Sequence, residues 1–123
     1  MPIPFFPEVT GSIDSTSPRH TFESRILIRL ERHGQKLSLQ GWARDLSESG
    51  LGAFVGDELL LGEFVTIEIP LPDFAKQSIP AKVTRVLGTA YGFQFTALSS
   101  EQRSQIRAAL QERPALPRYG TES

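Results

Sequence analysis

Residues 45–50, "DLSESG", lie between two apolar, strand-like segments, 36–46 and 50–55. Asp and Ser are turn formers because Asp45 and Ser47 can accept hydrogen bonds from amides two or three residues further on. Gly50 can adopt a positive φ or leave room for a close neighbour. The same residues form a polar pair beside a permissive glycine, an arrangement that can also hold a ligand. The stretch therefore predicts a turn and leaves open whether that turn is a binding site.

Segments on both sides of this turn alternate between apolar and polar residues, which is typical of half-buried β-strands. In 22–31, "FESRILIRLE", every second residue from Phe22 to Leu30 lies on one face, and charged residues dominate the other. The same alternation predicts further strands at 36–46, 50–55, 63–69, 78–88 and 91–97. The last two are joined by a turn short enough for a hairpin, and the final strand places Tyr91, Phe93 and Phe95 on one side.

The period changes after Leu98, where Ile106 and Leu110 are spaced four residues apart. Ser99 followed by Gln102 is a capping-box signature, and Pro114 is expected to end the helix. The chain is thus predicted to be mainly β, with about six short antiparallel strands and one C-terminal helix. Closing the strands into a six-stranded antiparallel barrel would remove exposed edges.

The chain has 123 residues, of which 39% are hydrophobic, and this suits a single domain. We divide it into an extended N-terminal arm (1–17) with the apolar island "IPFF", a barrel domain (18–113) and a tail (114–123). The sequence has no cysteine, which excludes disulfides and thiolate zinc sites. No apolar run approaches the ~20 residues of a membrane span, and the start does not resemble a secretion signal. We expect a cytoplasmic protein without membrane insertion.

Charge and residue types argue against several functions. The net charge is −1, whereas proteins that bind DNA or RNA usually carry a basic surplus. Residues 17–36 nevertheless hold five basic and two acidic side chains, a local surplus that favours a small anion. The acidic residues lack a metal-ligand spacing, and Asp45, Ser47 and His20 do not follow the usual order of a catalytic triad. We therefore expect no enzyme, no metal and no cofactor.

Six segments together resemble the PilZ domain, a family of bacterial receptors for the second messenger cyclic di-GMP. They are "PRHTFESRILIRL", "GWARDLSESGLGAFV", "LGEFVTIEIPLP", "IPAKVTRV", "YGFQF" and "LSSEQRSQIRAAL", between Pro18 and Leu110. The family pattern joins R-x-x-x-R before the first strand to D/N-x-S-x-x-G after the second, and the second element is complete as Asp45, Ser47 and Gly50. The resemblance also implies a six-stranded antiparallel barrel with a C-terminal helix.

The first element of the pattern is incomplete. If Arg19 is its second arginine, Ser15 stands where the first belongs, and the arm contains no Lys or Arg that could replace it. An arginine fork matches the O6 and N7 acceptors of guanine and contributes ~1–3 kcal/mol of discrimination. Loss of one such contact should weaken affinity roughly 10- to 100-fold. It could also limit binding to a single ligand molecule.

The resemblance implies that Arg19, Asp45, Ser47 and Gly50 bind the ligand. Asp45 would accept from the ring nitrogen and exocyclic amine of guanine, Ser47 would bond a base or phosphate, and Gly50 would permit close backbone approach. His20 and Arg44 are further candidates, each with an alternative interpretation as an ordinary surface residue. Trp42 is expected to serve in packing rather than in base stacking.

Two functions follow from these observations. In the first, cyclic di-GMP is held between the Arg19 arm and the loop 45–50, and binding changes the surface shown to an unknown partner protein in a bacterial signalling pathway. In the second, the chain is a PilZ-fold interaction adaptor that has lost nucleotide binding because position 15 is serine. The position of Arg19 relative to the Asp45 loop is the observation that bears most directly on this choice.

Overall fold

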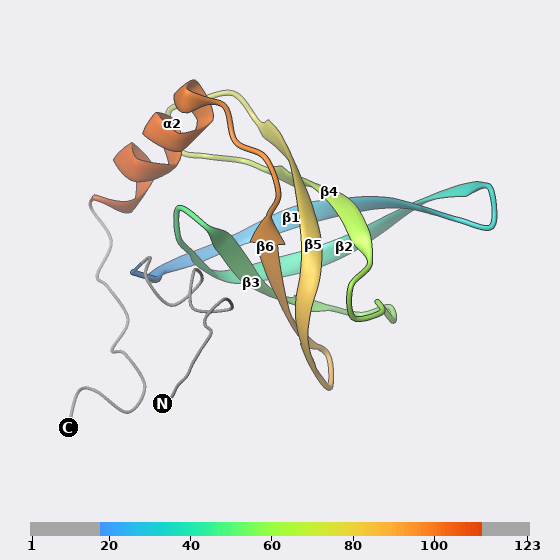
Figure 1. Ribbon diagram of the computed structural model, residues 1–123. Coiled ribbons are helices and arrows are strands. Elements are labelled where there is room, and N and C mark those ends of the chain that lie inside the picture. The colour runs from blue at the N-terminus through green and yellow to red at the C-terminus, as the bar shows by residue number, and fades with distance from the viewer. Residues whose placement is uncertain (1–17, 112–123) are drawn as a thin grey trace, which may run out of the picture.

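The computed structural model describes residues 18–111, which form a closed antiparallel barrel with one helix beside it (Figure 1). The elements are β1 (His20–Arg32), β2 (Gln35–Leu46), β3 (Gly50–Val55), β4 (Phe64–Ile69), β5 (Gln77–Leu87), β6 (Ala90–Phe95) and α2 (Ser100–Leu110). Around the barrel the strands follow the order β1-β2-β3-β6-β5-β4. The predicted fold class is thereby confirmed. The predicted arm and tail lie outside the described residues, and the domain boundaries stay a prediction.

The period-two alternation determines which side chains fill the barrel. In β1, Phe22, Ile26, Ile28 and Leu30 are all buried, as the pattern predicts. Burying one such side chain stabilises the fold by about 1.5–3 kcal/mol. The aromatic side chains of β6 are buried as well, so they belong to the core and offer no stacking surface to a single-stranded nucleic acid.

Two tight turns connect neighbouring strands through left-handed backbone conformations. His33 (φ 52°) and Gly34 (φ 78°) join β1 to β2, and two successive residues with positive φ give a hairpin the twist that its strands require. His33 is therefore a turn residue. Gly88 (φ 63°) lies in the turn between β5 and β6. The β1–β2 hairpin extends well beyond the rest of the barrel (Figure 1).

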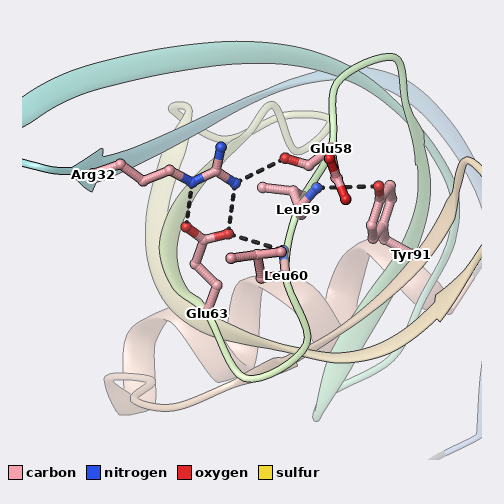
Figure 2. Close-up of polar contacts among 6 residues, drawn as sticks. All are labelled: Arg32, Glu58, Leu59, Leu60, Glu63 and Tyr91. Atoms are coloured by element: carbon pink, nitrogen blue, oxygen red, sulfur yellow. Dashed lines mark hydrogen bonds and ion pairs between the residues drawn. The ribbon is translucent and has the colours of Figure 1, made fainter.

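The connection between β3 and β4 is fixed by polar contacts to the barrel (Figure 2). Arg32 of β1 donates two hydrogen bonds to the Glu63 carboxylate, from Nε at 2.6 Å and from Nη2 at 2.8 Å. The same carboxylate accepts from the Leu60 amide at 3.0 Å. The hydroxyl of Tyr91 accepts from the amide of Leu59 at 3.1 Å. These contacts satisfy backbone groups that a loop would otherwise leave unpaired.

The helix α2 begins with the predicted capping box. The Ser99 hydroxyl accepts from the Gln102 amide at 3.0 Å, and the Gln102 side chain accepts from the Ser99 amide at 3.1 Å. Ile106, Ala109 and Leu110 form the buried face of the helix. Among residues 18–111, no helix is long and apolar enough to cross a membrane.

Candidate ligand-binding site

The structure brings Arg19 and Asp45 together at the start of β1. Thr21 pairs with Asp45 across β1 and β2, which places the residue just before β1 beside the end of β2. Arg19 donates from Nε to Oδ1 of Asp45 at 3.1 Å and from Nη2 to Oδ2 at 2.9 Å. Asp45 is only 5% exposed, whereas the Arg19 side chain is 45% exposed. Hydrogen bonding to Asp45 raises the pKa of Arg19, with burial acting in the opposite direction.

Ser47 closes the turn that the sequence predicts. Its amide donates to the Gly50 carbonyl at 2.9 Å, and its buried hydroxyl accepts from the amides of Ser49 and Gly50, each at 3.1 Å. The sequence also suggested that Asp45 would accept from nearby amides. In the structure the Asp45 carboxylate is paired with Arg19 instead. Of these two side chains, only that of Ser47 closes the turn.

The close approach of a neighbouring strand explains why position 50 is a glycine. A Cβ atom added at this position would lie 2.1 Å from the Phe93 carbonyl oxygen, on the adjacent strand β6. No side chain fits at that distance. The absence of a side chain at Gly50 is therefore a requirement of the β3–β6 pairing, and it accounts for the glycine without reference to a ligand.

Gly52 is a residue of the site that sequence reasoning missed. It pairs with Asp45 across β2 and β3, and a Cβ atom there would lie 2.8 Å from Oδ2 of Asp45. The missing side chain makes room for the carboxylate on the surface of the sheet. In the sequence this position appears only as the second glycine of "GLG". Its role beside Asp45 becomes apparent from the register between β2 and β3.

A β-bulge in β2 determines where Asp45 points. Ala43 faces the core, and strict alternation would direct Asp45, two residues later, to the same side. The register shifts between these residues, and the extra residue Arg44 lets both Arg44 and Asp45 lie on the outer face. The Arg44 guanidinium carbon lies 4.9 Å from the centre of the Phe54 ring, a cation–π contact on this face.

The remaining candidate, His20, and the tryptophan Trp42 lie nearby. Trp42 is 45% exposed on the outer face of β2, opposite Phe54 of β3, so it is a surface residue and not part of the core. His20 is the first residue of β1 and pairs with Leu46 of β2. The structure thus gathers Arg19, His20, Arg44, Asp45, Ser47 and Gly50 around one corner of the barrel.

The loop of this site is also braced by the helix. Arg107 of α2 donates to both carboxylate oxygens of Glu48, each at 3.0 Å. This pairing lowers the pKa of Glu48, although burial opposes the effect. Glu48 lies between Ser47 and Ser49, so the turn is fixed from the Arg19 side and from the helix side. Within the described residues, no group of three or more His, Asp or Glu side chains could hold a metal ion.

A comparison with family models identifies the class of protein that this barrel and corner define. The PilZ domain model matches residues 15–112, which is most of the chain. The chain therefore belongs to the PilZ domain family, as the motif predicted. No curated protein sequence matches the chain.

Solved structures of low sequence identity share the fold. The PilZ domain of CeSA from a cellulose-synthesising bacterium is 19% identical with a TM-score of 0.58, over 75% of this chain and 93% of that one. The PilZ domain of YcgR from Escherichia coli, solved with cyclic di-GMP, is 17% identical with a TM-score of 0.60, over 76% and 86%. The Bacillus subtilis inhibitor of motility MotI is 13% identical with a TM-score of 0.59, over 76% of this chain and 48% of that one.

Proposed function

We propose that this protein is a cyclic di-GMP receptor or adaptor module, with the ligand held between Arg19 and the loop 45–50. Membership of the PilZ family and the fold shared with YcgR support the proposal. The observation that carries it is the bidentate pair of Arg19 and Asp45 at the family motif.

The geometry of the pair shows which hydrogen-bond donors the Asp45 carboxylate can bind. A guanidinium presents two roughly parallel N–H donors to the carboxylate oxygens. The ring N–H and exocyclic amine of guanine present the same two donors. Guanine can therefore replace Arg19 on Asp45 without leaving the buried carboxylate unpaired, and the released arginine can bind O6 and N7 of the base or a phosphate.

Such an exchange would link ligand binding to the chain before β1. Arg19 immediately precedes β1, so the exchange moves a side chain at the entry to β1 from Asp45 to the ligand. The surface shown to a partner protein changes with it, which is a switch by rearrangement of one segment. The identity of that partner does not follow from the fold.

The alternative is a PilZ adaptor that no longer binds nucleotide. Ser15 in place of the first motif arginine favours it. So does the completeness of the Arg19–Asp45 pair, because a carboxylate that is already satisfied does not require a ligand. In this function the Arg19–Asp45 pair only stabilises the fold, and the barrel surface contacts a protein directly.

Calorimetric titration of the full chain with cyclic di-GMP separates the two functions. A receptor gives a dissociation constant in the micromolar range or tighter, and Arg19→Ala abolishes the heat. Arg25→Ala is the control for loss of one surface charge, because Arg25 is an exposed arginine of β1 that pairs with Trp42 and is not part of the motif. Absence of heat from the wild-type protein at high ligand concentration would support the adaptor.

A further inference from the structure

A second bulge, in β5, turns another arginine toward the outer face. Val83 is buried and pairs with Phe93, and strict alternation would direct Arg85 to the same side. The register shifts between Val83 and Arg85, so that Arg85 pairs with Gly92 and is exposed. The extra residue is Thr84, whose hydroxyl donates to the Gly92 carbonyl at 3.3 Å. Bulges commonly redirect a side chain in this way next to functional sites.

Two paired glycines connect this arginine to the motif corner. Gly52 of β3 and Gly92 of β6 are register partners, so they lie side by side on the same face of the sheet. A Cβ atom on Gly52 would contact the Asp45 carboxylate, and one on Gly92 would lie 3.5 Å from Nε and 3.7 Å from Cζ of Arg85. We call this pair of residues the glycine shelf. The carboxylate lies over Gly52 and the guanidinium lies over Gly92.

The two charged groups of the shelf lie within the reach of one nucleotide. Directly paired residues have their Cβ positions ≈ 4.5–5.5 Å apart. Oδ2 of Asp45 lies 2.8 Å from the Cβ position of Gly52, and Cζ of Arg85 lies 3.7 Å from that of Gly92. Oδ2 of Asp45 and Cζ of Arg85 are therefore at most about 12 Å apart. Neither glycine places a side chain between the two charged groups, so a ligand bound to Asp45 on the outer face can also contact Arg85.

We propose that Arg85 is the second arginine of the site and that it binds a phosphate of the ligand. This inference rests on the proposed function and supplies a guanidinium from the barrel where the arm has Ser15. A guanine held at Asp45 by its edge directs its ribose phosphate away from that carboxylate, along the shelf toward Arg85. Among residues 18–111, no ion pair engages Arg85, so its fork is available for two phosphate oxygens.

The charges around the shelf fit the same ligand. Arg19 lies beside the shelf through its pair with Asp45, Arg85 lies over Gly92, and Arg44 is on the same outer face over Phe54. Once guanine occupies Asp45, the surrounding guanidinium groups face the two negative phosphates of a cyclic dinucleotide. Arginine is suited to this role because its planar fork binds phosphate oxygens in a bidentate manner.

The test is calorimetric titration of the full chain with cyclic di-GMP, comparing wild type, Arg85→Ala, Arg85→Lys and the control Arg25→Ala. We expect Arg85→Ala to raise the dissociation constant about 10- to 100-fold. Arg85→Lys should fall between the two, because it keeps the charge but loses the fork. Arg25→Ala should bind as the wild type does. Thermal unfolding of each variant establishes that the barrel is intact.

The outcomes distinguish this inference from the function on which it rests. If the wild-type protein binds and Arg85→Ala binds equally well, the role of Arg85 is refuted and the receptor function stands. If the wild-type protein gives no heat, the receptor function fails and the role of Arg85 fails with it. A loss of affinity shared equally by Arg25→Ala would show a general effect of surface charge, and would also count against a specific contact.

Discussion

The Asp45 carboxylate and the Arg19 guanidinium, 26 residues apart in the chain, satisfy each other through two hydrogen bonds of 2.9 and 3.1 Å. One partner is buried and the other is half exposed. Any ligand that uses Asp45 must first break this pair. The measured affinity of the site therefore includes the free energy of the pair, and weakening the pair changes the protein even without ligand.

The strength of this pair can be measured with a double-mutant cycle of Arg19→Ala and Asp45→Ala. We expect a coupling free energy of about 1 kcal/mol, in the lower part of the usual range for contacting residues, because solvent screens the half-exposed arginine. Urea unfolding of the wild type, both single variants and the double variant gives this value. Additive single effects would show that the pair contributes nothing in solution.

Gly50→Ala tests the explanation of the motif glycine. The added Cβ would lie 2.1 Å from the Phe93 carbonyl oxygen, so β3 and β6 must separate. We expect a loss of about 1–3 kcal/mol in unfolding free energy, as for overpacked sites. Gly56→Ala is the control, because nothing lies within 4 Å of its added Cβ, and its effect should stay within about 0.5 kcal/mol. Equal effects of the two variants would contradict the explanation.

Gly52→Ala should affect the site more than the fold. Its added Cβ would contact a side-chain carboxylate, which can move, rather than a backbone carbonyl. We expect the displaced Asp45 to weaken cyclic di-GMP binding at least about tenfold, because one charge-assisted hydrogen bond contributes that much. The thermal midpoint should fall less than in Gly50→Ala. Unchanged affinity in calorimetry would show that Asp45 has no fixed role in binding.

Acid stability should depend on Glu63. Hydrogen bonds from Arg32 hold the pKa of Glu63 below its ordinary value of 4.5, against the opposing effect of burial. A carboxyl group with a lowered folded-state pKa stabilises the protein above its ordinary pKa, and this contribution is lost as the pH falls through the folded-state value. The difference in urea midpoint between wild type and Glu63→Gln should therefore be constant above about pH 5 and shrink toward pH 3. A difference that is independent of pH would contradict this account.

The strands could be predicted from the sequence because one face of each is buried in the barrel. The segment 50–55 coincides with β3, and the other strands differ by one or two residues at their ends. The helix cap at Ser99 could be predicted because it depends on residues three apart. The motif likewise identified the Asp45 corner, and it suggested that Arg19 would reach it.

The directions of Asp45 and Arg85 could not be predicted in the same way. Alternation alone would place both on the core side of their strands, with Ala43 and Val83. Each is turned outward by one extra residue, and the position of a bulge depends on how two strands pair. For the same reason, the roles of Gly52 and Gly92 became apparent only from the register. The Arg32–Glu63 pair, between residues 31 positions apart, is equally a product of the fold.

Trp42 gives this molecule a natural optical probe. It is the single tryptophan of the chain, it is partly open to solvent, and it lies three residues before Asp45 on the same outer surface. Its fluorescence therefore reports on one known location, and occupancy of that surface by a nucleotide or a protein can be followed without attaching a dye.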